Sequence, residues 1–75
     1  MEINDRITFN PEVMGGKPCI RGMRVTVSMI VSLVAEGYSR RDILDAYPYL
    51  EDQDITAALQ YAAFRVEEKE EPLAI

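Results

Sequence analysis

The spacing of hydrophobic positions changes once along this chain, close to residue 27. Before that point, RITF (residues 6–9) alternates polar and apolar residues, and residues about 23–26 again suit a strand. Two segments that break regular structure, NPEV and GGKP, lie between them. The pattern predicts two short strands that bracket a long, ordered loop and form a β ribbon over residues 6–26.

The apolar positions that follow have the period of an α-helix. One stripe of the first helix consists of Val27, Ile30, Val31 and Val34. Thr26 is placed to cap the helix start, and Gly37 stands where a left-handed residue ends a helix. Met29 and Leu33 form a second apolar stripe, so this helix is apolar nearly all round. Such a helix needs burial on most sides, which favours a second subunit.

Two more helices follow, separated by Pro48. SRRD (residues 39–42) resembles a capping box, with Ser39 as the cap and Asp42 three residues later. The third helix is predicted from about residue 52 to residue 68, and its acidic start suits the positive end of the helix dipole. Its core stripe is expected to consist of Ile55, Ala58, Leu59, Ala62 and Val66.

Together these elements predict a mainly α fold, a three-helix, homeodomain-like helix-turn-helix domain preceded by a short two-stranded β ribbon. We expect residues 1–68 to form this single domain, with the helices over residues 27–68, and residues 69–75 to form a flexible acidic tail. The core of so short a chain supplies about 3–5 kcal/mol of stability at most. We therefore expect a homodimer, or burial against a partner protein.

Composition excludes several kinds of site. The chain has one cysteine and no histidine, so neither an internal disulfide nor a zinc site of the usual Cys/His type can form. The N-terminal segment lacks the pattern of a signal peptide, and no apolar run approaches the roughly 20 residues that span a bilayer. We expect a cytoplasmic protein that does not act on a membrane and has no catalytic activity, cofactor or metal.

The stretch GGKPCIRGMRV (residues 15–25) raises two questions of chemistry. Its glycines do not follow the spacing of a phosphate-binding loop, and a proline interrupts them. We interpret four residues as structural parts of the loop: Gly15, Gly16, Pro18 and Gly22. Cys19 has no histidine as base and no second cysteine, so a small buried side chain is favoured over a reactive thiol.

Three segments together resemble one bacterial family: RITFNPEVMGGKPCIRGMRVTV, YSRRDILDAYPYL and DITAALQYAA. They are similar, over residues 6–64, to the family catalogued as domain of unknown function 433. Two positions depart from that family's pattern: Met23 replaces a threonine of the loop, and Glu51 replaces the usual Thr or Ser cap of the third helix. The resemblance implies a winged- or homeodomain-like fold. For many members it also implies the role of antitoxin in a type II toxin–antitoxin pair, with a PIN-like ribonuclease as toxin.

Our leading hypothesis is such an antitoxin, which binds its toxin through apolar helix faces. Ala57, Tyr61 and Phe64 lie at i, i+4 and i+7 on the third helix, partly apart from its core stripe. Either the β ribbon folds over these aromatic residues or they belong to an interface. The expected interface residues are Met29, Leu33, Ala57, Tyr61, Phe64 and Leu73. The acidic tail would cover the basic RNA-binding rim of the toxin.

The alternative hypothesis is a DNA-binding regulator of its own operon, and a plain assembly module is the third. Candidate contacts to operator DNA are Arg6, Lys17, Arg21, Arg24, Arg40, Arg41 and Gln53. In a helix-turn-helix the start of the recognition helix enters the major groove. Here that start carries Glu51, Asp52 and Asp54, whose charges repel phosphates. We therefore predict poor docking of this helix on DNA and favour a protein partner.

Overall fold

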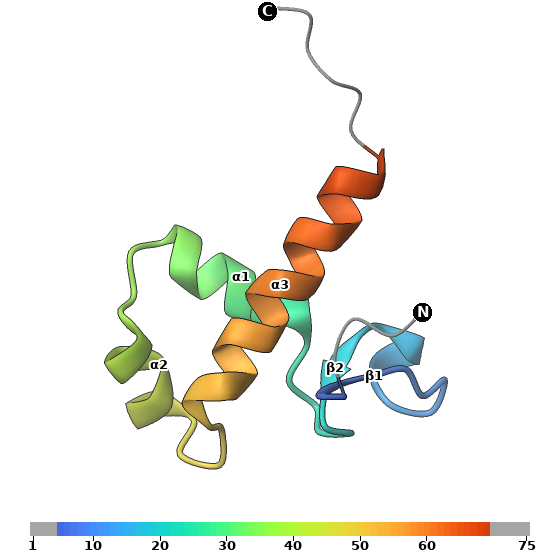
Figure 1. Ribbon diagram of the computed structural model, residues 1–75. Coiled ribbons are helices and arrows are strands. Elements are labelled where there is room, and N and C mark those ends of the chain that lie inside the picture. Colours follow the sequence, from blue (N-terminus) through green and yellow to red (C-terminus); the bar gives the residue numbers. More distant parts are fainter. Residues whose placement is uncertain (1–4, 70–75) are drawn as a thin grey trace, which may run out of the picture.

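The computed structural model describes residues 5–69, with side chains through residue 67. The elements in chain order are β1 (Ile7–Thr8), η1 (Met14–Gly16), β2 (Cys19–Ile20), α1 (Val27–Ala35), α2 (Arg40–Ala46) and α3 (Asp52–Lys69). Figure 1 shows the two-stranded ribbon to one side of the three helices. The predicted mainly α fold, three helices after a short antiparallel ribbon, is confirmed. None of the described helices combines the length and apolar character of a membrane span.

The ribbon lies in a different register from the predicted one. β1 and β2 pair antiparallel, with Ile7 opposite Ile20 and Thr8 opposite Cys19. The second strand therefore precedes the predicted position at residues 23–26, and that prediction is wrong. Those residues contribute one isolated bridge, between Thr26 and Cys19.

A tight turn after β2 explains this difference. The Met23 N–H donates to the Ile20 carbonyl at 2.8 Å. Arg21 and Gly22, at the centre of the turn, have φ values of 45° and 75°. Both values lie in the left-handed region, which glycine adopts without a Cβ clash and other residues rarely adopt. The chain then returns beside β2, where the Ile20 N–H donates to the Val25 carbonyl at 2.9 Å.

The glycine-rich loop before β2 is held in one shape by its backbone. Gly15 lies in the single turn of η1 with φ 67°, a conformation that glycine adopts without a Cβ clash. Gly16 ends this turn, and the Pro18 carbonyl accepts a hydrogen bond from the Val27 N–H at 3.0 Å. The loop is therefore fixed to the start of α1. The expected burial of Cys19 is confirmed, since the residue is 2% exposed.

The predicted starts of α1 and α2 are confirmed in detail. Thr26 Oγ1 accepts from the Met29 N–H at 3.1 Å. Ser39 and Asp42 form a capping box: the Asp42 N–H donates to Ser39 Oγ at 3.0 Å, and the Ser39 N–H donates to Asp42 Oδ2 at 3.1 Å. Gly37, just beyond α1, has φ 97°. Local side-chain chemistry thus sets these helix ends.

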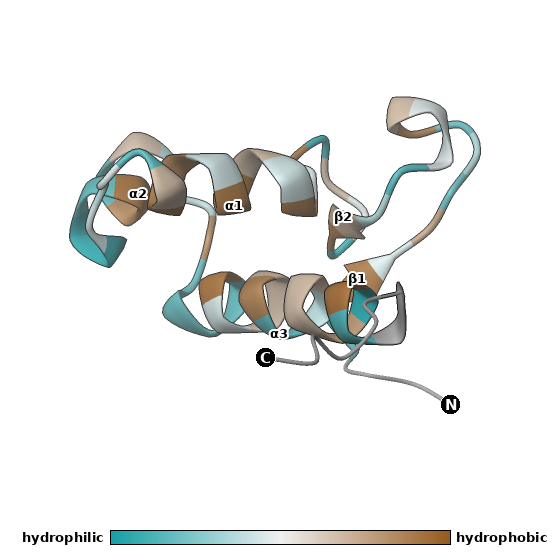
Figure 2. Cartoon of the chain, turned by 90° about the horizontal axis from the view of Figure 1, so that it is seen from above, coloured by the Kyte–Doolittle hydropathy of each residue, from teal (hydrophilic) through white to brown (hydrophobic). Residues whose placement is uncertain are grey.

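The core lies between the row formed by α1 and α2 and the helix α3 across from it (Figure 2). Its buried members are Ile20, Val25, Val27, Ile30, Ile43, Leu50, Ile55 and Ala58. The predicted burial of Ile55 and Ala58 on the core side of α3 is confirmed. Val66 is 57% exposed, so its assignment to the core is wrong. The reason is that the last turns of α3 extend beyond α1 and α2 (Figure 1).

Candidate functional site

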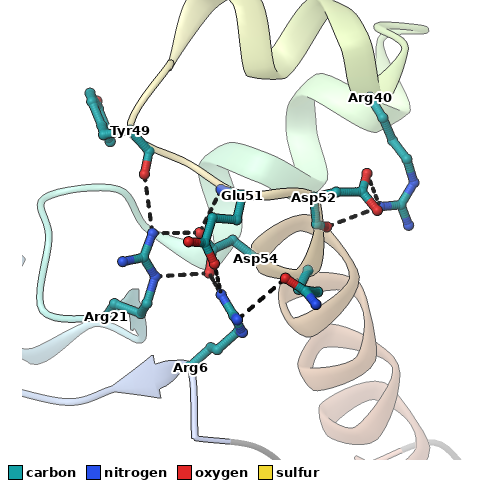
Figure 3. A network of polar contacts seen from close by, with 8 residues as sticks. Arg6, Arg21, Arg40, Tyr49, Glu51, Asp52 and Asp54 are labelled. Atoms are coloured by element: carbon teal, nitrogen blue, oxygen red, sulfur yellow. Dashed lines mark hydrogen bonds and ion pairs between the residues drawn. The ribbon is translucent and has the colours of Figure 1, made fainter.

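Asp54, in the first turn of α3, is fully buried with 0% of its surface exposed. Its Oδ1 accepts hydrogen bonds from Arg6 Nη1 at 2.7 Å and from Arg21 Nε at 3.0 Å. Its Oδ2 accepts from Arg21 Nη2 at 2.8 Å and from the Glu51 backbone N–H at 2.8 Å. Figure 3 shows both arginines reaching the carboxylate. We name Arg6, Arg21, Glu51 and Asp54 the Asp54 cluster.

Glu51 takes part in the cluster through two different groups. Its backbone N–H donates a hydrogen bond to the carboxylate of Asp54, and this bond is one half of a capping box at the start of α3. Its side chain accepts a hydrogen bond from Arg6 Nη1 at 2.8 Å. Asp54 therefore satisfies the Glu51 N–H at the start of α3 without a Thr or Ser cap at position 51.

Arg21 reaches Asp54 from a constrained backbone position. Its φ of 45° is unfavourable for a residue with a Cβ, by about 1–2 kcal/mol. Its backbone N–H donates to the Arg6 carbonyl at 2.8 Å, so the two arginines are held side by side on the ribbon. Arg21 Nη2 also donates to the Tyr49 carbonyl at 3.1 Å. The cluster thus joins the ribbon, the segment before α3 and α3 itself.

The bonding of Asp54 decides its protonation state. Burial raises the pKa of Asp54, but the hydrogen bonds from Arg21, the Glu51 N–H and Arg6 outweigh it and lower the pKa from 3.8 to about 2. The same contacts raise the pKa of both Arg6 and Arg21. No buried polar side-chain atom of the described residues lacks a hydrogen-bond partner. Asp54 is therefore an ionised, saturated structural carboxylate at neutral pH and not a general acid or base.

The lowered pKa of Asp54 predicts a loss of stability in acid. The folded-state value of about 2 lies below the ordinary 3.8, so folding stability from this group is complete above about pH 4 and is lost as the pH falls through 2. The shift corresponds to about 2 kcal/mol. Urea unfolding at a series of pH values measures it. The Asp52→Asn variant should show the same loss, and stability that stays constant between pH 4 and pH 2 would contradict the assignment.

A second ion pair lies beside the cluster and is exposed. Arg40 Nη1 binds Asp52 Oδ1 at 2.9 Å and the Asp52 carbonyl at 3.1 Å, while Arg40 Nη2 donates to Thr56 Oγ1 at 2.9 Å. The two charged side chains keep 44% and 62% of their surface exposed. Such a pair contributes at most about 1 kcal/mol. With it, all three carboxylates at the start of α3 face an arginine (Figure 3).

The candidate contacts to DNA fall into two groups. One group is bound within the chain: Arg6 and Arg21 to Asp54, Arg40 to Asp52, and Gln53, whose Oε1 accepts from Arg6 Nη2 at 3.4 Å. The other group consists of Lys17, Arg24 and Arg41, which are exposed and form no ion pair with any described residue. Arg24 makes one long contact, from Nη1 to the sulfur of Met14 at 4.0 Å. From the sequence, Arg6, Arg21 and Arg40 were expected to contact DNA, and their pairing with Asp54 and Asp52 was not predicted.

One aromatic residue of α3, Tyr61, contacts the segment that follows β1. Phe9, just after β1, lies edge-on to Tyr61 with ring centroids 5.9 Å apart. Tyr61 and Phe64 are half-buried. Ala57, expected at the interface, is 4% exposed and buried within this chain, so its assignment to the interface is wrong. The aromatic face of α3 was expected either to lie under the ribbon or to belong to an interface. The contact between Phe9 and Tyr61 favours the first alternative for Tyr61.

Two shallow hollows lie elsewhere on the surface. Met29 and Leu33, both expected at the interface, are half-buried and line a hollow of about 270 Å³ with Ser28, Ser32 and Tyr47. A larger, open hollow of about 440 Å³ on the last turns of α3 is lined by Ala62, Ala63, Val66 and Glu67. Leu73 and the acidic tail lie outside the described residues. Among the described side chains, no group of acidic residues and cysteine could hold a metal ion.

Comparison with known proteins places the chain in a family. A family model described as "Protein of unknown function (DUF433)" matches residues 7–62. "Uncharacterized protein y4eO" of Sinorhizobium fredii is 39% identical over 56 residues, which are 75% of this chain and 25% of that protein. The crystal structure of a DUF433 member protein from Anabaena variabilis has a TM-score of 0.77 and 32% identity, and the match covers 84% of this chain and 62% of that one.

This chain thus spans about a quarter of the length of the first relative and under two thirds of the second. The matched region runs from the ribbon through most of α3, so it includes Arg21, Glu51 and Asp54 of the Asp54 cluster. The solved relative shares the arrangement of three helices after a short antiparallel ribbon. On the sequence match and the shared fold together, the chain belongs to the DUF433 family of proteins of unknown function.

Proposed function

We propose that this protein binds a partner protein and acts as the antitoxin of a PIN-like ribonuclease toxin. One observation carries the proposal. The last turns of α3 extend beyond the other helices (Figure 1) and keep apolar surface in solvent, with Val66 57% exposed beside an open hollow. Apolar surface of this kind, bordered by charge, is typical of a site where another protein binds.

The distribution of cations weighs against DNA as the main partner. A helix-turn-helix would insert the start of α3 into the major groove, with basic side chains on the phosphates. Here Arg6 and Arg21 cover that start and are bound to Asp54. Arg40, on α2, is bound to Asp52. The groups that DNA recognition would need are therefore already engaged.

DNA binding by this protein is expected to be weak and only mildly salt-dependent. If the three unpaired candidate cations neutralise about three phosphates per chain, the slope of log K against log salt concentration is about −3. Fluorescence anisotropy with a labelled duplex, over roughly 50–200 mM salt, measures this slope. Tight binding with a slope of about −5 or steeper would show that the paired arginines also reach phosphates, and would contradict this account.

The Asp54 cluster also bears on how a nuclease would be neutralised. A PIN-like ribonuclease holds Mg²⁺ with clustered carboxylates. To insert Arg6 or Arg21 into such a cluster, this protein would first have to break their bonds to Asp54. Binding through the exposed end of α3 would break none of these bonds, because that end offers apolar surface and the carboxylate of Glu67. We therefore propose inhibition by covering the basic RNA-binding rim rather than by occupying the metal site.

The test uses the full chain and the protein that copurifies with it from its source organism. The copurified protein alone should cleave RNA and stop growth when it is expressed. An equimolar amount of this chain should abolish both effects. A copurified protein without ribonuclease activity, or a ribonuclease that this chain leaves active, would contradict the antitoxin role.

A further inference from the structure

The last turns of α3 carry an open hollow, and its use as a docking site rests on the proposed protein-binding function. Ala62, Ala63, Val66 and Glu67 line it, and we name these four residues the α3 end face. Ala62 and Val66 are four positions apart, as are Ala63 and Glu67, so the face consists of two neighbouring rows of the helix surface. The hollow measures about 440 Å³ and is open to solvent.

The described residues outside α3 leave most of this face open to solvent. Val66 is 57% exposed and Ala63 is exposed, although Ala62 touches the edge of the core. Figure 1 shows the last turns of α3 standing clear of α1, α2 and the ribbon. A helix end that keeps valine in solvent gains stability when a partner covers it.

The shape of the face suits a helix. Ala62 and Ala63 have small side chains, so a second helix can approach this end of α3 at the usual interaxial distance of about 8–10 Å. Val66, which is 57% exposed, then provides an apolar contact to the partner. An amphipathic helix docks in this way, with anchors at i, i+3, i+4 and i+7.

The negative charge near the α3 end face favours a positively charged partner. Glu67 lines the hollow, and residues 65–71 hold four glutamates against Arg65 and Lys69, so this end of the chain is acidic. A partner helix with lysine or arginine beside its apolar stripe would complement these charges. A second copy of this chain would instead oppose like charges, because each chain has a net charge of −5.

We propose that the α3 end face is the docking site for a basic amphipathic helix of the partner protein. The probe is a synthetic helical peptide of about 18 residues, with leucine at helical spacing and lysine elsewhere. It is titrated into the isotope-labelled full chain. The largest NMR shifts should lie at the α3 end face, and a peptide with glutamate in place of lysine should not bind.

Two matched pairs of variants locate the site. Val66→Glu should weaken peptide binding about tenfold or more, whereas Val34→Glu makes the same change at an exposed valine of α1 and should leave it within about twofold. Glu67→Lys should weaken binding through its charge, whereas Asp45→Lys, at an exposed position of α2, should have a smaller effect. Circular dichroism checks that each variant is folded. Equal effects within each pair, or shifts centred elsewhere, would overturn the proposal.

The failures of the two proposals can be told apart. If the peptide docks on the α3 end face but the chain neutralises no ribonuclease, the docking site stands and the antitoxin role falls. If a ribonuclease is neutralised equally by the natural chain and by Val66→Glu, the antitoxin role stands and the docking site falls. A stable dimer whose contacts lie on the α3 end face would also overturn the docking proposal.

Discussion

Replacing Asp54 with asparagine is expected to remove about 3 kcal/mol of folding free energy. The carboxylate is fully buried and accepts hydrogen bonds from Arg6, Arg21 and the Glu51 N–H. The asparagine side chain carries no charge and cannot accept all of these bonds, and Arg21 would keep its unfavourable φ without its partner. Because the core of so small a domain supplies only about 3–5 kcal/mol, the variant should keep little folding stability, and a measurable fraction of it should be unfolded at room temperature.

Asp52→Asn is the matched control for this experiment. It makes the same chemical change two positions earlier, also opposite an arginine, but at a side chain that is 62% exposed. Its cost should stay below about 1 kcal/mol. Urea unfolding followed by circular dichroism compares the two variants. Equal costs would show that burial of Asp54 does not matter to stability, and would contradict the structural role of the Asp54 cluster.

Replacing Ile55 with alanine is expected to cost about 3 kcal/mol. Ile55 is 0% exposed and lies in the core between α3 and the α1–α2 row. The truncation removes apolar contacts and leaves a cavity that the surrounding helices fill only in part. Thermal or urea unfolding of the variant measures the loss.

Val66→Ala is the control, since the sequence places Val66 on the same helical stripe as Ile55. Val66 is 57% exposed, so its truncation should change stability by less than about 0.5 kcal/mol. A large cost at Val66 would mean that the last turns of α3 are covered within the same chain. That result would remove the basis for a docking site there.

The helix ends could be predicted from sequence because their causes are local. Thr26 caps α1 and the Ser39–Asp42 box caps α2 through contacts within three residues. The buried part of α3 was harder to predict. The helical period shows which residues lie on the same side of α3, but not how much of that side the neighbouring helices cover. Ile55 is covered and Val66 is not, because α1 and α2 end short of the last turns of α3.

The Asp54 cluster could not be predicted because its members are far apart in sequence. Arg21 and Asp54 are separated by 33 positions, and Arg6 and Asp54 by 48. Hydropathy patterns carry no signal for such a pairing. The unexpected register of the ribbon has a related cause. The turn after β2 places Arg21 at φ 45°, a conformation that a residue with a Cβ does not favour locally. The bonds of Arg21 to Asp54 and to the Tyr49 carbonyl accompany that conformation.

The most direct test of the account is amide hydrogen exchange of the full chain, alone and with its copurified partner. We expect the partner to slow exchange in the last turns of α3, around the α3 end face. Exchange around Arg6, Arg21 and the start of α3 should not change, because the Asp54 cluster is already closed within the chain. Slowed exchange at the ribbon and α2, with the end of α3 unchanged, would contradict the account.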